Sequence, residues 1–140
     1  MTAFDQLREE GELLIEEDKF AEALEKFQGA WKELAEPNRE EDAAIEILAA
    51  IADCHFFLKN WDACHDAMQQ ALRCGADIAN PFIRLRLGQS LYELGDEQEA
   101  ANWLVPVYLT EGREPFSEDP KYLEFFRSKL KPPEGGWPEG

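Results

Sequence analysis

One pattern of small and large residues recurs three times along this chain of 140 residues, and it constrains the fold more than any other feature. In each copy a small residue is followed by a larger one after three positions and by a second small residue after twelve. The small residues are Gly11, Ala52 and Gly88, followed by Ala23, Cys64 and Ala100. Small side chains let two helices approach closely, and the bulky groups between them fill the interface. The pattern therefore predicts three helical hairpins, each needing a neighbour to bury its second face.

Hydrophobic periodicity supports helices independently of the repeat. Apolar residues from Phe20 to Leu34 and from Phe82 to Leu94 follow a spacing of three or four, with charged residues between them. Polar residues and glycine at 17–19, 59–60 and 94–96 predict the turns inside the hairpins. No segment alternates with a period of two for long enough to form a strand. The predicted fold class is therefore all-α.

The repeated residues resemble the tetratricopeptide (TPR) family, most clearly from Asn80 to Ala100 (NPFIRLRLGQSLYELGDEQEA). The resemblance covers about Phe4 to Tyr108 and implies three antiparallel helical hairpins in a right-handed superhelical stack. The copies lie 41 and 36 residues apart, counted between their second small residues, whereas the family repeats about every 34 residues. The first gap therefore needs longer helices around 37–39, where the chain is expected to turn.

We expect a single TPR-like domain over 1–131, with hairpins at about 3–36, 41–74 and 80–110. A proline at position 106 lies inside the last of these helices and is expected to kink it or loosen its final turn.

A capping helix is predicted over about 119–130, because Asp119 can act as an N-cap with Pro120 in the first helical position. Its apolar stripe consists of Leu123, Phe126 and Leu130. Repeat arrays need such a helix to cover the open face of the last hairpin. The Pro- and Gly-rich tail over 132–140 is predicted to be flexible or to lie across the surface.

Charge restricts the kinds of partner. Thirty acidic residues against fourteen basic ones give a net charge of −16, which repels nucleic-acid phosphates and anionic membranes and favours a basic protein. The acidic start of the chain does not resemble a signal peptide, and no segment approaches the roughly 20 apolar residues of a membrane helix. Three cysteines cannot all pair within one chain. We therefore expect a reduced, cytoplasmic protein.

Two Cys-His pairs, Cys54-His55 and Cys64-His65, offer ligand types that suit tetrahedral zinc. However, His55 and Cys64 occupy repeat positions where the other copies have leucine and alanine, and adjacent helical residues point about 100° apart. We expect packing roles, no metal and no cofactor, with zinc as the alternative. The chain has no phosphate loop, nucleophile elbow or His-Glu-x-x-His motif. An enzyme, and therefore any catalytic residue, is not expected.

The resemblance implies that the first helices of the hairpins line a concave groove that binds a partner. The expected groove residues are Asp5, Arg8, Glu12, Glu16, Glu46, Ala49, Asp53, Phe56, Phe57, Phe82, Arg86, Gln89 and Glu93. Aromatic groups can anchor an apolar helix or loop while carboxylates pair with flanking lysine or arginine. Phe56 and Phe82 could equally pack between hairpins.

Co-chaperone members of the family bind a partner's terminal carboxylate with a clamp of lysine, arginine and asparagine. That clamp is not expected here, because Arg8 and Glu12 stand at two of its positions and Asp53 adds negative charge.

The segments FIRLRLGQSLYELGD and GREPFSEDPKYLEFF resemble small free-standing bacterial TPR proteins of polymorphic toxin loci. This implies an immunity or antitoxin-type protein that neutralises a basic partner by tight binding. The alternative is a chaperone like those of type III secretion translocators, or a generic adaptor, holding a peptide segment in the groove. Such chaperones usually carry a dimerisation helix before the repeats, whereas the first repeat here starts by Phe4. The convex face and the C-terminal helix, with Tyr122 and Phe125, are alternative surfaces, and the oligomeric state stays open.

Overall fold

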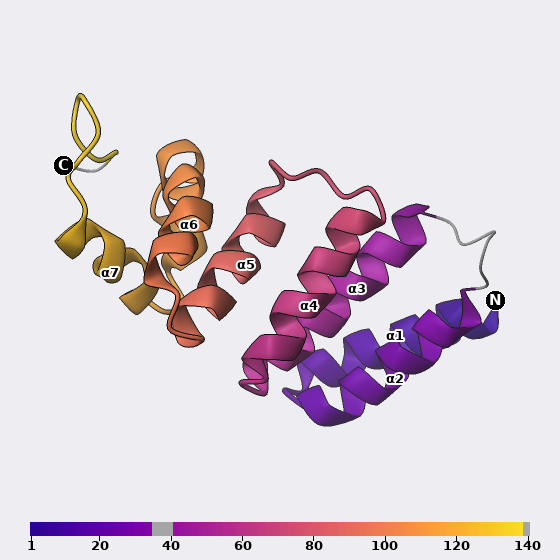
Figure 1. Ribbon diagram of the computed structural model, residues 1–140. Helices are drawn as coiled ribbons and strands as arrows, with labels where there is room; N and C mark the ends of the chain where they lie inside the picture. Colours follow the sequence, from indigo (N-terminus) through magenta and orange to yellow (C-terminus); the bar gives the residue numbers. More distant parts are fainter. Residues whose placement is uncertain (35–40, 139–140) are drawn as a thin grey trace. The chain divides into compact units, whose positions relative to one another are not determined.

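The computed structural model describes residues 1–34 and 41–138, which form helices and connecting turns without a strand (Figure 1). In chain order the helices are α1 (Ala3–Glu16), α2 (Phe20–Glu33), α3 (Glu41–Phe57), α4 (Trp61–Arg73), α5 (Pro81–Glu93), α6 (Glu97–Glu111), the short 3-10 helix η1 (Glu114–Phe116) and α7 (Lys121–Lys129). The predicted all-α fold, with three hairpins and a further helix after them, is confirmed. The turn expected at 37–39 lies outside the described residues.

Contacts divide the chain into two compact units, Met1–Ile78 and Ala79–Gly140. The first unit contains the hairpins α1–α2 and α3–α4, and the second contains the hairpin α5–α6 followed by η1 and α7. The single domain over 1–131 stays a prediction. No described helix is long and apolar enough to span a membrane.

The predicted small residues stand where helices approach most closely. A side-chain carbon added to Gly11 would lie 2.6 Å from the Phe27 ring, and one added to Gly88 would lie 2.4 Å from Leu104 Cγ. In the α3–α4 hairpin, Ala52 and Cys64 are both fully buried. The tight turns are also alike, since Asp18, Lys59 and Gly95 each have a positive φ in the turn of its hairpin. The three hairpins therefore share the same close helix contact at small residues and the same kind of turn.

The helix α6 continues through Pro106 to Glu111 without ending there. Proline has no N–H to donate to the carbonyl oxygen of Asn102, four residues earlier. The structure replaces that donor, because Arg84 Nη2 on α5 donates to the Asn102 carbonyl oxygen at 2.9 Å. The Arg84 guanidinium also lies 4.8 Å from the ring centroid of Trp103. The neighbouring helix therefore satisfies the carbonyl that proline leaves without its usual partner.

The helix α7 begins near the predicted cap, because Asp119 Oδ1 accepts a hydrogen bond from the backbone N–H of Lys121 at 3.2 Å. Two members of the predicted stripe, Leu123 and Phe126, are buried. The third, Leu130, follows the last helical residue and is 42% exposed. The stripe is therefore shorter than the sequence indicates.

Aromatic rings bind the end of the second unit together around Tyr108. Its ring centroid lies 6.0 Å from that of Phe116, 5.8 Å from Phe126 and 5.8 Å from Trp137. Trp137 is only 8% exposed. The segment after α7, predicted to be flexible or to lie across the surface, is therefore held against α6 and α7 at this tryptophan.

Candidate protein-binding surface

The helices α1 and α3 bring predicted groove residues together around Arg8. Its guanidinium lies 3.8 Å from Asp5 and 3.3 Å from Glu12 on α1, and 3.6 Å from Glu46 on α3. The pairs within α1 form because residues three and four apart share one side of a helix. The guanidinium of Arg8 therefore lies among three carboxylates from two helices.

The start of α1 fixes the first of these carboxylates. The Thr2 hydroxyl accepts from the backbone N–H of Asp5, while the Asp5 carboxylate accepts from the backbone N–H and the hydroxyl of Thr2. The hydrogen bonds from Thr2 lower the pKa of Asp5, and the nearby Arg8 lowers it further. Asp5 is therefore held in its charged form in the first turn of α1.

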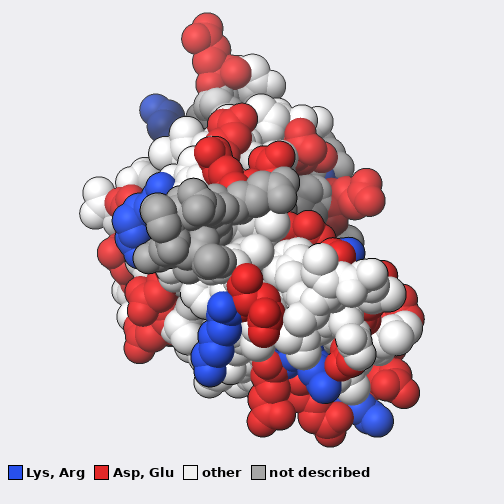
Figure 2. Space-filling view, turned by 90° about the vertical axis from the view of Figure 1, so that its right-hand side faces the viewer, with Lys and Arg blue, Asp and Glu red and all other residues white. Residues whose placement is uncertain are grey.

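Two more predicted acids extend this surface, which we call the α1–α3 face. Glu16 lies one turn beyond Glu12 on α1 and is exposed, and Asp53 lies two turns beyond Glu46 on α3 and is half-buried. The predicted residue between Glu46 and Asp53, Ala49, is half-buried and small. Among the described residues named for this face, five are carboxylates and one, Arg8, is a cation, so acidic side chains predominate. The face of the molecule drawn in Figure 2 likewise carries many acidic and few basic side chains.

An aromatic ladder lies at the turn end of the first unit and connects three helices. The rings of Phe20 on α2 and Phe57 on α3 are stacked with centroids 4.7 Å apart. Phe56 meets Phe57 edge-on at 5.4 Å and Trp61 of α4 at 5.5 Å. Phe56 thus packs within the α3–α4 hairpin, whereas the sequence offered a place in the groove or packing between hairpins. Phe57 is 39% exposed and offers an apolar surface.

Phe20 and Trp61 belong to this surface, although neither was expected there from the sequence. Both stand nine residues after the first small residue of their repeat, at Gly11 and Ala52. Because of that shared position, Phe20 begins α2 and Trp61 begins α4. The same position in the repeat could have indicated that both rings lie beside the end of α3.

In the second unit, Glu93 at the end of α5 was predicted to face the groove, but it already contacts α7. Glu93 Oε2 accepts from the Tyr122 hydroxyl at 2.9 Å and pairs with Lys121 Nζ at 2.7 Å. The hydrogen bond to Glu93 raises the pKa of Lys121. Burial, and then the hydrogen bond to Glu93, raise the pKa of Tyr122. Glu93 therefore attaches α7 to α5, through a contact that was not predicted from the sequence.

The other predicted groove residues of α5 are mostly buried. Arg86 is 8% exposed and Gln89 is 5% exposed, and Arg86 Nη1 donates to Gln89 Oε1 at 2.8 Å. The Arg86 guanidinium also lies 5.4 Å from the ring centroid of Phe82, which is 36% exposed. Only Phe82 of these three presents appreciable surface. Their expected role was to face a partner, but the arginine and the glutamine are satisfied inside the protein.

The alternative surface on the C-terminal helix needs a similar correction. Tyr122 is 1% exposed and Phe125 is 8% exposed. Both rings pack on Tyr92 of α5, with centroids 5.6 and 4.6 Å from its own. These aromatic groups hold α7 in place and do not face solvent.

The cysteine and histidine pairs lie in packed surroundings. Cys54 and Cys64 are fully buried, and burial raises the pKa of Cys54 to about 12, so its thiol stays protonated at neutral pH. Burial also lowers the pKa of His55, whose Nδ1 lies 3.3 Å from Asn60 Nδ2. Among the described residues, no group of three or more Cys, His, Asp or Glu side chains is placed to hold a metal ion.

No protein-family model matches the chain, and no curated protein matches it. A solved structure of the Hsp90 co-chaperone Cns1 from Saccharomyces cerevisiae matches with a TM-score of 0.66 and 18% sequence identity. The match covers 89% of this chain and 37% of that chain. An identity this low shows a shared fold and nothing more. The chain has a TPR-like helical repeat fold.

Proposed function

We propose that this chain is a non-catalytic protein-binding module whose α1–α3 face binds a basic partner. The observation that carries the proposal is the set of three carboxylates around the guanidinium of Arg8, with Glu16 and Asp53 farther along the same two helices. Such a face attracts lysine and arginine and speeds encounter with a basic protein. Exposed ion pairs contribute only about 0–1 kcal/mol each, so the exposed ring of Phe57 supplies the apolar anchor.

More specifically, we propose an immunity or antitoxin-type protein that binds a basic toxin tightly and blocks it sterically. A net charge of −16 on 140 residues supports a small neutraliser of a basic enzyme. The resemblance of its third repeat and of the segment after it to TPR proteins of toxin loci supports the same class. We place this protein in the cytoplasm, where its cysteines stay reduced.

The second candidate is a chaperone or adaptor that holds a peptide segment of its partner. The co-chaperone Cns1 shares the TPR-like fold of this chain, and the comparison supports this candidate through that fold alone. A clamp for a terminal carboxylate is not part of this candidate. Arg8, the cation at the clamp position, is already surrounded by Asp5, Glu12 and Glu46, and these carboxylates would repel the incoming one. The segment held would instead be apolar or basic.

Charge reversal on the face tests the binding proposal. Glu12→Lys with Asp53→Lys should weaken binding to the toxin encoded beside this gene by at least about tenfold, equivalent to roughly 1.4 kcal/mol. The matched control is Glu25→Lys with Asp66→Lys, which makes the same change in net charge at exposed positions on the second helices α2 and α4. Calorimetric titration measures both variants, and circular dichroism checks that their helix content is unchanged. Equal affinity in the two variants would exclude the α1–α3 face.

Co-expression distinguishes the two candidates. An immunity protein should abolish the activity of the neighbouring toxin when both are made in one cell. If no neighbouring toxin loses activity, the immunity proposal fails. A chaperone should instead keep an apolar secreted substrate soluble, and that substrate should aggregate when this chain is removed.

A further inference from the structure

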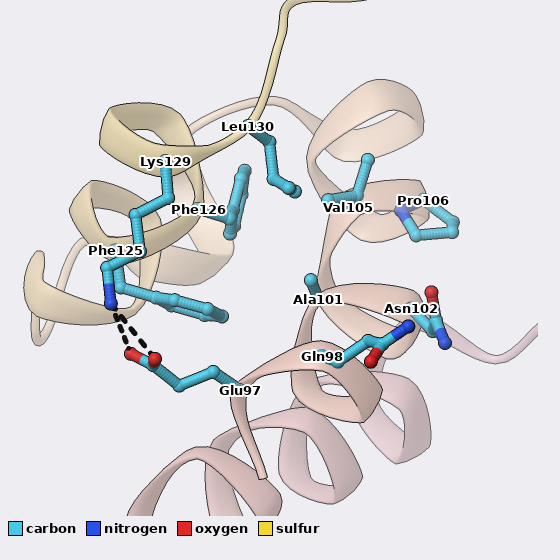
Figure 3. Close-up of a pocket in the computed structure, with 10 residues that line it drawn as sticks. All are labelled: Glu97, Gln98, Ala101, Asn102, Val105, Pro106, Phe125, Phe126, Lys129 and Leu130. Atoms are coloured by element: carbon cyan, nitrogen blue, oxygen red, sulfur yellow. Dashed lines mark hydrogen bonds and ion pairs between the residues drawn. The ribbon is translucent and has the colours of Figure 1, made fainter.

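The segment after α7, residues 131–138, has one buried side chain, and that side chain is aromatic. Trp137 is 8% exposed, while the residues on either side of it are exposed. Its ring centroid lies 5.8 Å from that of Tyr108 on α6 and 5.7 Å from that of Phe126 on α7. Figure 3 shows Phe126 between these two helices. We call the surface formed by the rings of Tyr108 and Phe126 the Trp137 site, and residues 131–138 the C-terminal segment.

Two glycines let the C-terminal segment turn back onto the helices. Gly135 and Gly136 have φ values of 90° and 86°, which residues other than glycine rarely adopt. The Gly136 N–H donates to the Pro133 carbonyl oxygen at 2.8 Å, so this hydrogen bond closes a turn inside the segment itself. A side-chain carbon added to either glycine would meet no described residue within 4 Å. The buried contact that fixes the segment on α6 and α7 is therefore the indole of Trp137.

The Trp137 site contains a polar group that its present occupant leaves unsatisfied. The Tyr108 hydroxyl is buried, and it has no hydrogen-bond partner among the described residues. A buried hydroxyl without a partner is unfavourable, because it has given up its hydrogen bonds to water. An aromatic segment that also brought a carbonyl or carboxylate oxygen to this hydroxyl would therefore have an advantage over the present occupant.

We propose that the Trp137 site binds a tryptophan in an extended, proline-containing segment of a partner protein, and that the C-terminal segment occupies the site in the free protein. The chain itself shows which chemistry fits, an indole followed directly by Pro138. Proline-containing segments dock on surfaces lined by aromatic rings because they are already extended and lose little freedom on binding. The Arg127 guanidinium lies 5.7 Å from the Tyr108 ring centroid. This cation favours acidic flanks, such as Glu134 of the C-terminal segment, over basic ones.

The C-terminal segment regulates the site, because it competes with the partner. Residues 130–136 join Trp137 to the end of α7, and a link this short holds the indole at an effective concentration of about 1 mM or more. A partner binds only where Trp137 has left, so its apparent dissociation constant rises as the fraction of open molecules falls. The C-terminal segment therefore excludes weak aromatic ligands and yields to a partner that also pairs with the Tyr108 hydroxyl.

Trp137→Ala in the full chain opens the site and tests the proposal. The probe is a synthetic peptide with the sequence of residues 131–138 (KPPEGGWP), titrated while the NMR signals of the Tyr108 and Phe126 rings are followed. It should bind this variant with a dissociation constant of about 1 mM or below, and the unmodified protein at least about tenfold more weakly. Trp61→Ala is the matched control, because Trp61 lies in the first unit and its loss leaves Trp137 in place. This control should bind the peptide as weakly as the unmodified protein does.

A second variant opens the site without removing an aromatic ring. Gly135→Pro with Gly136→Pro fixes both φ values near about −65°, whereas the bound segment has 90° and 86°. Trp137 should then leave the site, and the peptide should bind as tightly as it does to Trp137→Ala. Circular dichroism checks that the helix content of every variant is unchanged.

Three results would overturn the proposal. The first is the absence of any change in the Tyr108 and Phe126 signals of both opened variants with about 5 mM peptide, which exceeds the expected dissociation constant. The second is equal binding by a peptide with alanine in place of its tryptophan. The third is equal binding by Trp137→Ala and the unmodified protein, because the C-terminal segment would then not compete. The charge-reversal variants of the α1–α3 face lie in the first unit and leave this site intact, so either proposal can fail without the other.

Discussion

Gly88 shows how strongly one residue constrains a hairpin of this fold. A methyl group there would lie 2.4 Å from Leu104 Cγ and 3.1 Å from the backbone oxygen of Ala100. Leu104 is fully buried and the backbone cannot move away easily, so Gly88→Ala should destabilise the protein by about 1–3 kcal/mol. Urea unfolding measures the change.

The matched control is Gly29→Ala, also inside a helix, where the added carbon meets only the tip of Leu7 at 3.3 Å. That end of a flexible side chain can turn aside, and alanine is the better helix former by up to about 1 kcal/mol. The control should therefore be neutral or stabilising. Equal stability of Gly88→Ala and the unmodified protein would contradict close approach of α5 and α6.

Tyr122 makes the stability depend on pH in the alkaline range. Its pKa is raised above the ordinary value of 10.0, mainly by burial, so the folded state retains the phenol proton where the unfolded state has lost it. This contribution to stability is complete below pH 10 and is lost as the pH rises above it. Tyr122→Phe keeps the ring but removes the hydroxyl that donates to Glu93.

At pH 8 we expect Tyr122→Phe to lower the free energy of unfolding by about 1 kcal/mol, the usual contribution of one hydrogen bond. Above pH 10 the variant should lose stability less steeply than the unmodified protein. Urea midpoints measured at several values of pH give both slopes. Parallel slopes would mean that Tyr122 does not titrate differently in the folded and unfolded states.

At the scale of the element, α6 depends on α5 to tolerate its proline. Arg84→Met should lower the stability by about 1 kcal/mol or more, because the Asn102 carbonyl oxygen loses its donor. In a Pro106→Ala background the new N–H can bond to that carbonyl oxygen, so the same substitution should cost less. A double-mutant cycle measured by urea unfolding isolates this coupling. Arg84→Met removes the contact with Trp103 in both backgrounds, so that loss cancels when the two costs are compared. Equal costs in the two backgrounds would contradict the coupling.

The helices themselves could be predicted from the sequence, whereas the contacts that satisfy them could not. Small residues such as Gly11 and Ala23 recur at a fixed spacing, and periodicity alone therefore indicated the hairpins. The donor for the Asn102 carbonyl oxygen lies 18 residues away, and the hydroxyl that donates to Glu93 lies 29 residues away. Neither separation follows the repeat, so no local pattern indicated either pair.

The limits of local sequence patterns also explain which parts of the candidate site could be predicted. Arg8 and Glu46 lie together because α1 and α3 are successive first helices of their repeats, and that both residues line a partner-binding groove stays a prediction. Arg86 and Gln89 fit the same pattern but are buried. Whether a polar position on a helix faces solvent depends on what packs over it, and the spacing of residues along one helix does not contain that information.

At the scale of the whole molecule, the net charge of −16 acts on stability and on binding in opposite directions. Carboxylates outnumber cations by two to one, so like-charge repulsion in the folded state outweighs exposed pairs such as Lys26 with Glu10. Added salt screens that repulsion over a Debye length of about 8–10 Å. The melting temperature should therefore rise as sodium chloride increases from about 0.02 to 0.3 M.

Over the same range, association with a basic partner should slow, because salt also screens the attraction that steers the two proteins together. Stopped-flow association rates and calorimetric melting temperatures, measured in the same buffers, give both trends. A protein that becomes more stable while it binds more slowly cannot be losing its partner through unfolding. If the melting temperature instead falls as salt is added, specific ion pairs such as those of Arg8 outweigh the repulsion. In that case the acidic surface stabilises the fold, and its charge alone no longer supports a basic partner.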